Sequence, residues 1–130
     1  MDYTITPSID GTFITLKVKG NIIRQTIMKA ILEAHALGRQ LKVNRYLLDV
    51  TEAKNTEDTF GNYQFAYHDM QKIEGIDNNA HVAILVNPKD HSHDFAEIVS
   101  RNAGLNVRIF TDPVLAKKFL MYAHSPNKTI

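Results

Sequence analysis

The stretch HVAILV (residues 81–86), continued by NPKDHSHDFAEIVSRNAG (87–104), decides the fold of this chain. Its first part is apolar without interruption, as a strand is when both faces of its sheet are buried. Its second part places two histidines, two aspartates, a lysine and a serine within eight positions. Apolar residues at helical spacing follow. Strand, polar loop and helix in this order predict a βα unit of a parallel sheet.

A similar unit precedes this one in the chain. YLLDV (46–50) predicts a second buried strand, and the polar loop TEAKNTED (51–58) follows it. A helix over about 60–74 is predicted next, because aromatic and apolar residues recur there at helical spacing. The stripe consists of Phe60, Tyr63, Tyr67 and Met70.

The N-terminal part predicts a hairpin and a first helix. Asp10-Gly11 separates two β-prone segments, which is a strong turn signal because glycine accepts positive φ. Apolar residues then alternate with polar ones at 14–19, so this strand buries one face. The helix after it is predicted to begin at an Asn21 cap and to end at Gly38.

The C-terminal part predicts a helix, a short strand and a last helix. Ser92 is the predicted cap of a helix over 93–103, which Gly104 ends, and VRIF (107–110) is the strand. Asp112 caps the last helix and Pro113 starts it, an arrangement that helix starts favour. One domain is predicted over residues 1–124, with a frayed tail at 125–130.

The predicted element order is β-β-α-β-α-β-α-β-α, an α/β fold. It implies a mostly parallel sheet with an N-terminal antiparallel hairpin and with helices mainly on one face. YLLDV and HVAILV are apolar on both faces, so the second face needs a cover as well. A helix, a second subunit or a lipophilic ligand would supply it, and a second subunit is the commonest solution.

Composition narrows the classes of function. The formal charge of the 130 residues is +1, without the clustered basic face that nucleic-acid binding needs, so no nucleic acid is expected. The absence of cysteine excludes disulfides and thiol catalysis. Neither a leader-like start nor an apolar run of about 18 residues is present, which predicts a cytoplasmic protein without membrane insertion.

At this level the chain resembles a known fold. YLLDVTEAKNTEDTFG (46–61), the helix after it and HVAILV resemble the STAS and SpoIIAA-like domains. The likeness is greatest to small bacterial proteins described as SpoIIAA-like or STAS/CRAL-TRIO-like. In the anti-anti-sigma factors of this fold, a serine of an Asp-Ser-Ser-Gly motif is phosphorylated. The matching positions here are Asp58-Thr59-Phe60-Gly61, so the resemblance implies Thr59 as a candidate phosphoacceptor.

Polar residues gather where the predicted parallel strands end, and ligands bind at this edge in open α/β sheets. The candidate binding or regulatory residues there are Asp49, Thr51, Asp58, Thr59, Asp90, His91 and His93. Asp49 is expected to cap loop amides, because a carboxylate in an apolar strand needs partners. His91 and His93 are the candidate metal ligands, but a helix starting at Ser92 would turn them apart. The stretch is therefore read as a helix start, and no cofactor is expected.

Three functions follow from this sequence. The first is a non-enzymatic STAS-like interaction or regulatory module that binds another protein or itself, most simply as a homodimer. Its candidate interface is the apolar patch of Phe60, Tyr63, Phe65 and Tyr67. The alternative is a small carrier that holds a lipophilic ligand between sheet and helices. A second alternative is a metal-dependent hydrolase that uses His91 and His93.

Overall fold

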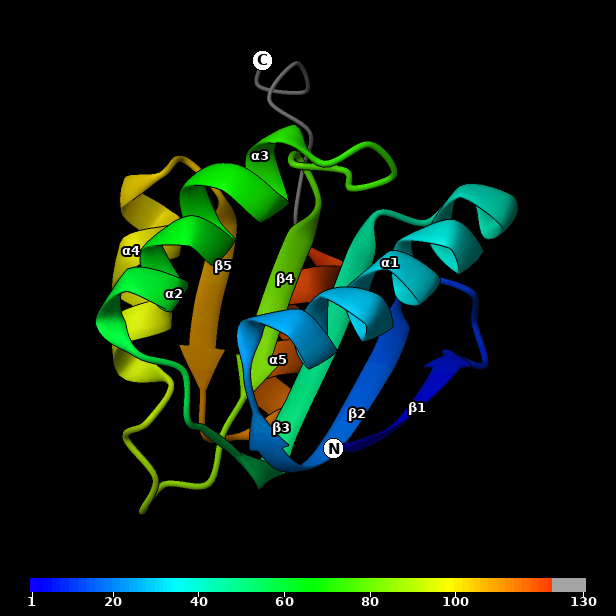
Figure 1. The fold of residues 1–130 in the computed structure, drawn as a ribbon. Helices are drawn as coiled ribbons and strands as arrows, with labels where there is room; N and C mark the ends of the chain where they lie inside the picture. Colours follow the sequence, from blue (N-terminus) through cyan, green and yellow to red (C-terminus); the bar gives the residue numbers. More distant parts are fainter. Residues whose placement is uncertain (123–130) are drawn as a thin grey trace.

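A computed structural model describes residues 1–122 and contains one five-stranded sheet with helices on both faces (Figure 1). The strands lie in chain order across the sheet; only the first pair is antiparallel, and the other neighbours are parallel. They are β1 (Asp2–Pro7), β2 (Ile14–Ile22), β3 (Arg45–Asn55), β4 (His81–Leu85) and β5 (Asn106–Phe110). The predicted fold class and hairpin are confirmed.

Helices cover the two faces unequally (Figure 1). The first face carries α1 (Arg24–Leu41), α2 (Thr59–Gln64), the π-helix η1 (Phe65–Asp69), α3 (Met70–Lys72) and α4 (Asp94–Asn102). The second face carries α5 (Pro113–Met121). The helix predicted over 60–74 is thus three helical segments in direct succession. The tail predicted at 125–130 lies outside the described residues.

The second face of the sheet is covered by α5. Ala116 and Leu120 are fully buried against Leu47, Ala83 and Leu85. Of the three covers that the sequence left open, a helix is therefore the one that lies over the centre of this face. Beside it, β1 and β2 present polar side chains on this face because they alternate with the buried ones: Thr4, Thr6, Thr15, Lys17 and Lys19.

Several local predictions are confirmed by the structure. Gly11 takes a φ of 73° in the hairpin turn, and Gly104 takes a φ of 89° after α4. Asp112 caps α5, since its Oδ1 accepts the Val114 N–H at 2.9 Å, and Pro113 occupies the first turn. No helix within residues 1–122 is long and apolar enough to cross a membrane.

Both predicted ends of the first helix are wrong. Asn21 belongs to β2, and the backbone N–H of Arg24 is instead capped by Glu57, whose Oε2 accepts it at 2.7 Å. α1 continues past Gly38 to Leu41 and closes with Lys42 in the left-handed conformation (φ 59°). The cap at its start comes from a residue far along the chain, so local sequence could not reveal it.

The loop predicted at 51–58 is also largely wrong. Residues 51–55 continue β3, which stays paired with β2 as far as Ile22 and Asn55. A register shift between Lys17 and Lys19 accommodates the extra length of β3. The polar sequence reads as a loop, yet pairing with the long β2 satisfies its backbone groups.

Candidate functional site

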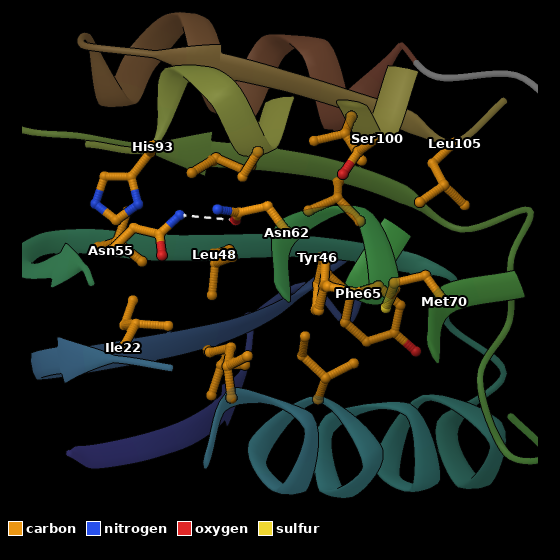
Figure 2. Close-up of a pocket in the computed structure, with 18 of the residues that line it drawn as sticks. Ile22, Tyr46, Leu48, Asn55, Asn62, Phe65, Met70, His93, Ser100 and Leu105 are labelled. Carbon is orange, nitrogen blue, oxygen red and sulfur yellow. Dashed lines mark hydrogen bonds between the residues drawn. The ribbon is translucent and has the colours of Figure 1, made fainter. Parts of the chain in front are cut away.

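A cavity of about 110 Å³ lies between the first face of the sheet and its helices (Figure 2). Its walls come from β3, from α1 and from the α2–η1–α4 side, and they are almost entirely apolar. Prominent apolar lining residues are Leu16, Ile27, Ile31, Tyr46, Leu48, Val50, Phe65, Met70, Val82, Ile84, Leu105 and Val107. The cavity thus runs along most of the length of β3.

The arrangement of the helices leaves this space open. α1 lies over β2 and β3, whereas α2, η1 and α4 lie toward β4 and β5 (Figure 1). Leu48 points between the two groups and stays partly accessible, although it belongs to the central strand. A central strand that is apolar on both faces is normally buried on both. The accessible surface of Leu48 therefore marks the floor of a site rather than the outer surface.

A polar network borders one end of the cavity. Asn55, the last residue of β3, donates from Nδ2 to Oδ1 of Asn62 on α2 at 3.1 Å (Figure 2). Asn62 donates in turn to the Asp58 carbonyl oxygen at 2.9 Å. Ser92, the predicted cap of α4, instead accepts the backbone N–H of Asn55 at 3.0 Å, and α4 starts without a side-chain cap. These bonds join the end of β3 to the start of α2 and to the loop before α4.

An ion pair joins the start of α1 to η1. Arg24 donates from Nε to Oδ2 of Asp69 at 2.6 Å and from Nη2 to Oδ1 at 2.8 Å, and a further nitrogen bonds Gln64. Asp69 is 2% exposed, and Arg24 holds the pKa of its carboxyl below the usual range. Because Arg24 also lines the cavity, this bridge ties together the two helix groups that flank it.

Two aromatic rings stack where β3 begins. His35 of α1 and Tyr46 lie 4.5 Å apart, centroid to centroid, with planes 3° apart. The Asp77 N–H donates to His35 Nδ1 at 2.9 Å, so the ring proton of neutral His35 is on Nε2. Burial lowers the pKa of His35 to about 4 and raises the pKa of Tyr46 to about 12. Both rings are therefore uncharged at neutral pH.

The structure divides the residues predicted for the strand edge into separate groups. Asp90 stays beside His93, with Oδ2 3.4 Å from Nε2. Asp49 and Thr51 lie together, because Asp49 Oδ1 accepts the N–H and the hydroxyl of Thr51 at 3.0 and 2.7 Å. Thr51 and Asp90 also line a shallow polar pocket outside the main cavity. Asp58 and Thr59 are exposed at the start of α2, where Asp58 caps the helix through the Gly61 N–H at 2.7 Å.

The two candidate metal ligands face different surroundings. His91 is exposed and its Nδ1 lies 3.1 Å from Oδ2 of Asp94. His93 is buried, lines the cavity and donates from Nε2 to the Ala53 carbonyl oxygen at 3.1 Å. Within residues 1–122, no group of three or more metal-binding side chains comes together.

Most of the predicted aromatic interface lies on the surface. Tyr63 is 6.1 Å from the ring of Tyr67 and 5.8 Å from the ring of Phe95 on α4, and Phe60 is 68% exposed nearby on α2. We call these four residues the aromatic patch. Phe65, which was predicted to belong to the interface, instead lines the cavity. The π-helical turn of η1 begins at Phe65, and such turns are frequent at functional sites.

Sequence reasoning missed these polar residues around the cavity: Arg24, His35, Asn55, Glu57, Asn62, Asp69 and Ser100. His35 had one usable signal, since it follows Ile27 and Ile31 at helical spacing and therefore belongs to the buried face. Arg24 and Asp69 lie far apart in sequence and neither belongs to a motif, so only the fold pairs them.

The element order and the sheet topology define an α/β architecture of the SpoIIAA-like type. A similar solved structure is the crystal structure of an uncharacterized protein from the DUF3478 family, with a SpoIIAA-like fold, from Shewanella loihica PV-4. The two chains are 18% identical, the TM-score is 0.52, and the match covers 92% of each. The predicted SpoIIAA-like domain is thereby confirmed. No family model and no curated protein matches the chain.

Proposed function

We propose that this protein is a non-enzymatic binding module that holds a small, mostly apolar molecule in the cavity. The observation that carries the proposal is the apolar cavity of about 110 Å³ above a partly accessible Leu48. Small-molecule sites are typically concave and apolar with a few placed polar groups. An engineered apolar cavity of about 150 Å³ binds benzene. A single ring or a short hydrocarbon chain is therefore the expected size of ligand.

The ionisable groups that line the cavity favour binding over catalysis. Arg24 is paired with Asp69, and Glu57 accepts two backbone N–H groups, those of Arg24 and Asp58. His35 and His93 each use one ring nitrogen for a backbone group. A catalytic acid or base must reach the proton that it transfers. These side chains are engaged in structural bonds, which supports a role in shaping the site.

The test is calorimetric titration of the protein with toluene, a neutral single-ring hydrocarbon of the expected size. Leu48→Phe adds a ring into the cavity and should weaken toluene binding at least tenfold. Ile98→Phe makes a comparable change on the exposed side of α4 and should leave toluene binding unchanged. Melting curves establish that both variants fold. Absence of saturable binding to the wild type, or equal affinity in Leu48→Phe, would refute the proposal.

Native mass spectrometry of the purified protein gives an independent test. A mass excess that disappears under denaturing conditions would identify a bound ligand or metal by its value. If the protein is a carrier, the mass excess should match that of a small organic molecule. Repeated preparations at the sequence mass would count against a tightly held ligand.

A second candidate function is protein interaction through the aromatic patch. Phe60 and Tyr63 are 68% and 47% exposed, and contiguous exposed apolar surface is typical of interaction sites. Thr59 adjoins this patch and is exposed, so phosphorylation there would add negative charge beside it. Intact mass of protein purified from cells tests that modification, with Thr59→Ala as control.

Self-association through the patch is tested by sedimentation equilibrium. The double variant Phe60→Ser, Tyr63→Ser should shift the equilibrium toward monomer. Tyr122→Ser removes an aromatic ring that is 67% exposed beyond α5 and should have no effect. A wild type that stays monomeric at all concentrations would exclude the second copy as the partner.

A further inference from the structure

Ser100 of α4 is a buried polar residue whose hydroxyl has no hydrogen-bond partner among residues 1–122. The residue is 4% exposed and lines the cavity, and Figure 2 shows its hydroxyl oxygen directed toward the cavity. Its backbone carbonyl accepts the Leu105 N–H at 3.0 Å, but no group within residues 1–122 bonds the hydroxyl. A serine inside a helix usually bonds the preceding turn or faces water. Here it makes no bond to the preceding turn, and its oxygen keeps a small accessible surface on the cavity side.

An apolar cavity offers such a hydroxyl few hydrogen-bond partners. Buried polar side chains nearly always have a partner, and the exceptions call for an explanation. Alanine would fill the same space without an unsatisfied hydroxyl. The placement of a serine in an apolar wall is therefore accounted for by a partner that enters the cavity.

His35 supplies a second group of the same kind. Its Nδ1 accepts the Asp77 N–H, which leaves the proton on Nε2, and no acceptor within residues 1–122 bonds that nitrogen. The ring lines the same cavity as Ser100. The walls therefore offer two uncharged hydrogen-bond donors.

The charges around the cavity determine what kind of molecule these donors suit. Arg24 lines the cavity, and Asp69 already neutralises it at 2.6 Å. The lining carboxylate of Glu57 is likewise engaged, since it accepts the backbone N–H groups of Arg24 and Asp58. His35 stays neutral because burial lowers its pKa to about 4. An ionised ligand would therefore bury a charge without a counter-charge, which is strongly unfavourable.

We propose that the cavity takes an uncharged amphipathic molecule, such as a small alcohol, phenol or ketone, whose oxygen hydrogen-bonds the hydroxyl of Ser100. The hydrocarbon part contacts Leu48, Phe65 and Val82. This inference rests on the proposed binding function and adds the chemical class of the ligand and the residue that recognises its polar group.

The experiment compares phenol with toluene, which has nearly the same shape, by calorimetric titration of the wild type and Ser100→Ala. Phenol affinity should fall about fivefold in Ser100→Ala, as for loss of one hydrogen bond. Toluene affinity should stay the same or rise slightly. Thr26→Ala removes an exposed hydroxyl of α1 and should change neither affinity. Melting curves show whether each variant is folded.

The outcomes separate this inference from the function on which it rests. Toluene binding with no selective loss of phenol in Ser100→Ala would overturn the role of Ser100 and leave the cavity function standing. Failure of both ligands to bind the wild type would overturn both. Neutral benzamide and anionic benzoate test whether the cavity excludes a charged ligand. Benzoate should bind at least about tenfold more weakly than benzamide. Equal or tighter binding of benzoate would overturn the uncharged class.

Discussion

Gly38 lies where α1 comes closest to the start of β3. A Cβ built at Gly38 would be 2.7 Å from the Val43 carbonyl oxygen and would collide with the Tyr46 hydroxyl. The sequence suggested a helix end, because glycine commonly terminates helices. The actual requirement is close approach, which explains why the helix continues past it.

Gly38→Ala is therefore expected to destabilise the protein by about 1–3 kcal/mol, as overpacking does, despite the higher helix propensity of alanine. Urea unfolding of wild type and variant measures the difference. Gln40→Ala, at an exposed position of the same helix, serves as the control and should change stability by less than about 0.5 kcal/mol. A gain in stability from Gly38→Ala would contradict the packing argument.

His35 should make the stability depend on pH. Its pKa falls from 6.5 in the unfolded chain to about 4 in the folded protein. As the pH drops, His35 is protonated in the unfolded chain before it is protonated in the folded protein. The free energy of unfolding is therefore highest above pH 6.5 and falls between pH 6.5 and 4. The loss amounts to about 3 kcal/mol. Urea unfolding at several pH values in this range measures the effect. The free energy of unfolding should fall less steeply with decreasing pH in His35→Gln than in the wild type, and an equal pH dependence would refute the role of His35.

At the scale of elements, the Arg24–Asp69 bridge joins α1 to η1. Breaking a buried ion pair from one side leaves a buried charge without a partner. Arg24→Met should therefore cost about 2–3 kcal/mol, somewhat less than for a fully buried pair, because the Arg24 side chain is 31% exposed and partly screened by solvent. A double-mutant cycle with Asp69→Asn measures the coupling. A coupling near zero would show that the two helices are held by packing alone.

The exposed pair Lys17–Glu52 provides the matched comparison. Its atoms lie 2.9 Å apart, close to the Arg24–Asp69 separation, but the side chains are 40% and 52% exposed. Solvent screening weakens such exposed pairs, so the coupling here should be much smaller than that of Arg24 with Asp69. Double-mutant cycles on both pairs test whether burial, rather than distance, decides the strength of an ion pair in this protein.

At the scale of the whole molecule, α5 stabilises the sheet from its second face. Leu120 is fully buried against the sheet, whereas Leu115 of the same helix is 52% exposed. Leu120→Ala should cost about 2–5 kcal/mol because it leaves a cavity under α5, while Leu115→Ala should have little effect. Thermal or urea unfolding measures both. Similar losses for the two variants would argue against α5 as the cover of this face.

The order and direction of the elements were predictable from the sequence. The alternation at 14–19, the turn at Asp10-Gly11 and the Asp112-Pro113 start of α5 all depend on residues a few positions apart. Local backbone preference and hydrophobic periodicity determine such features. The same local signals misled at Asn21, which lies within β2 and pairs with β3, and at Ser92, whose hydroxyl bonds the distant Asn55 N–H.

The candidate site depended on tertiary structure. Of the edge residues predicted from the sequence, His93 lines the cavity, whereas Asp49, Thr51 and Asp90 lie outside it. The cavity exists because α1 and the α2–η1–α4 side leave the floor at Leu48 uncovered, and Ser100 and His35 reach it from different helices. Spacing along the chain determines which face of an element is apolar. Whether the faces of distant elements fill the space between them is decided only when the chain is packed in three dimensions.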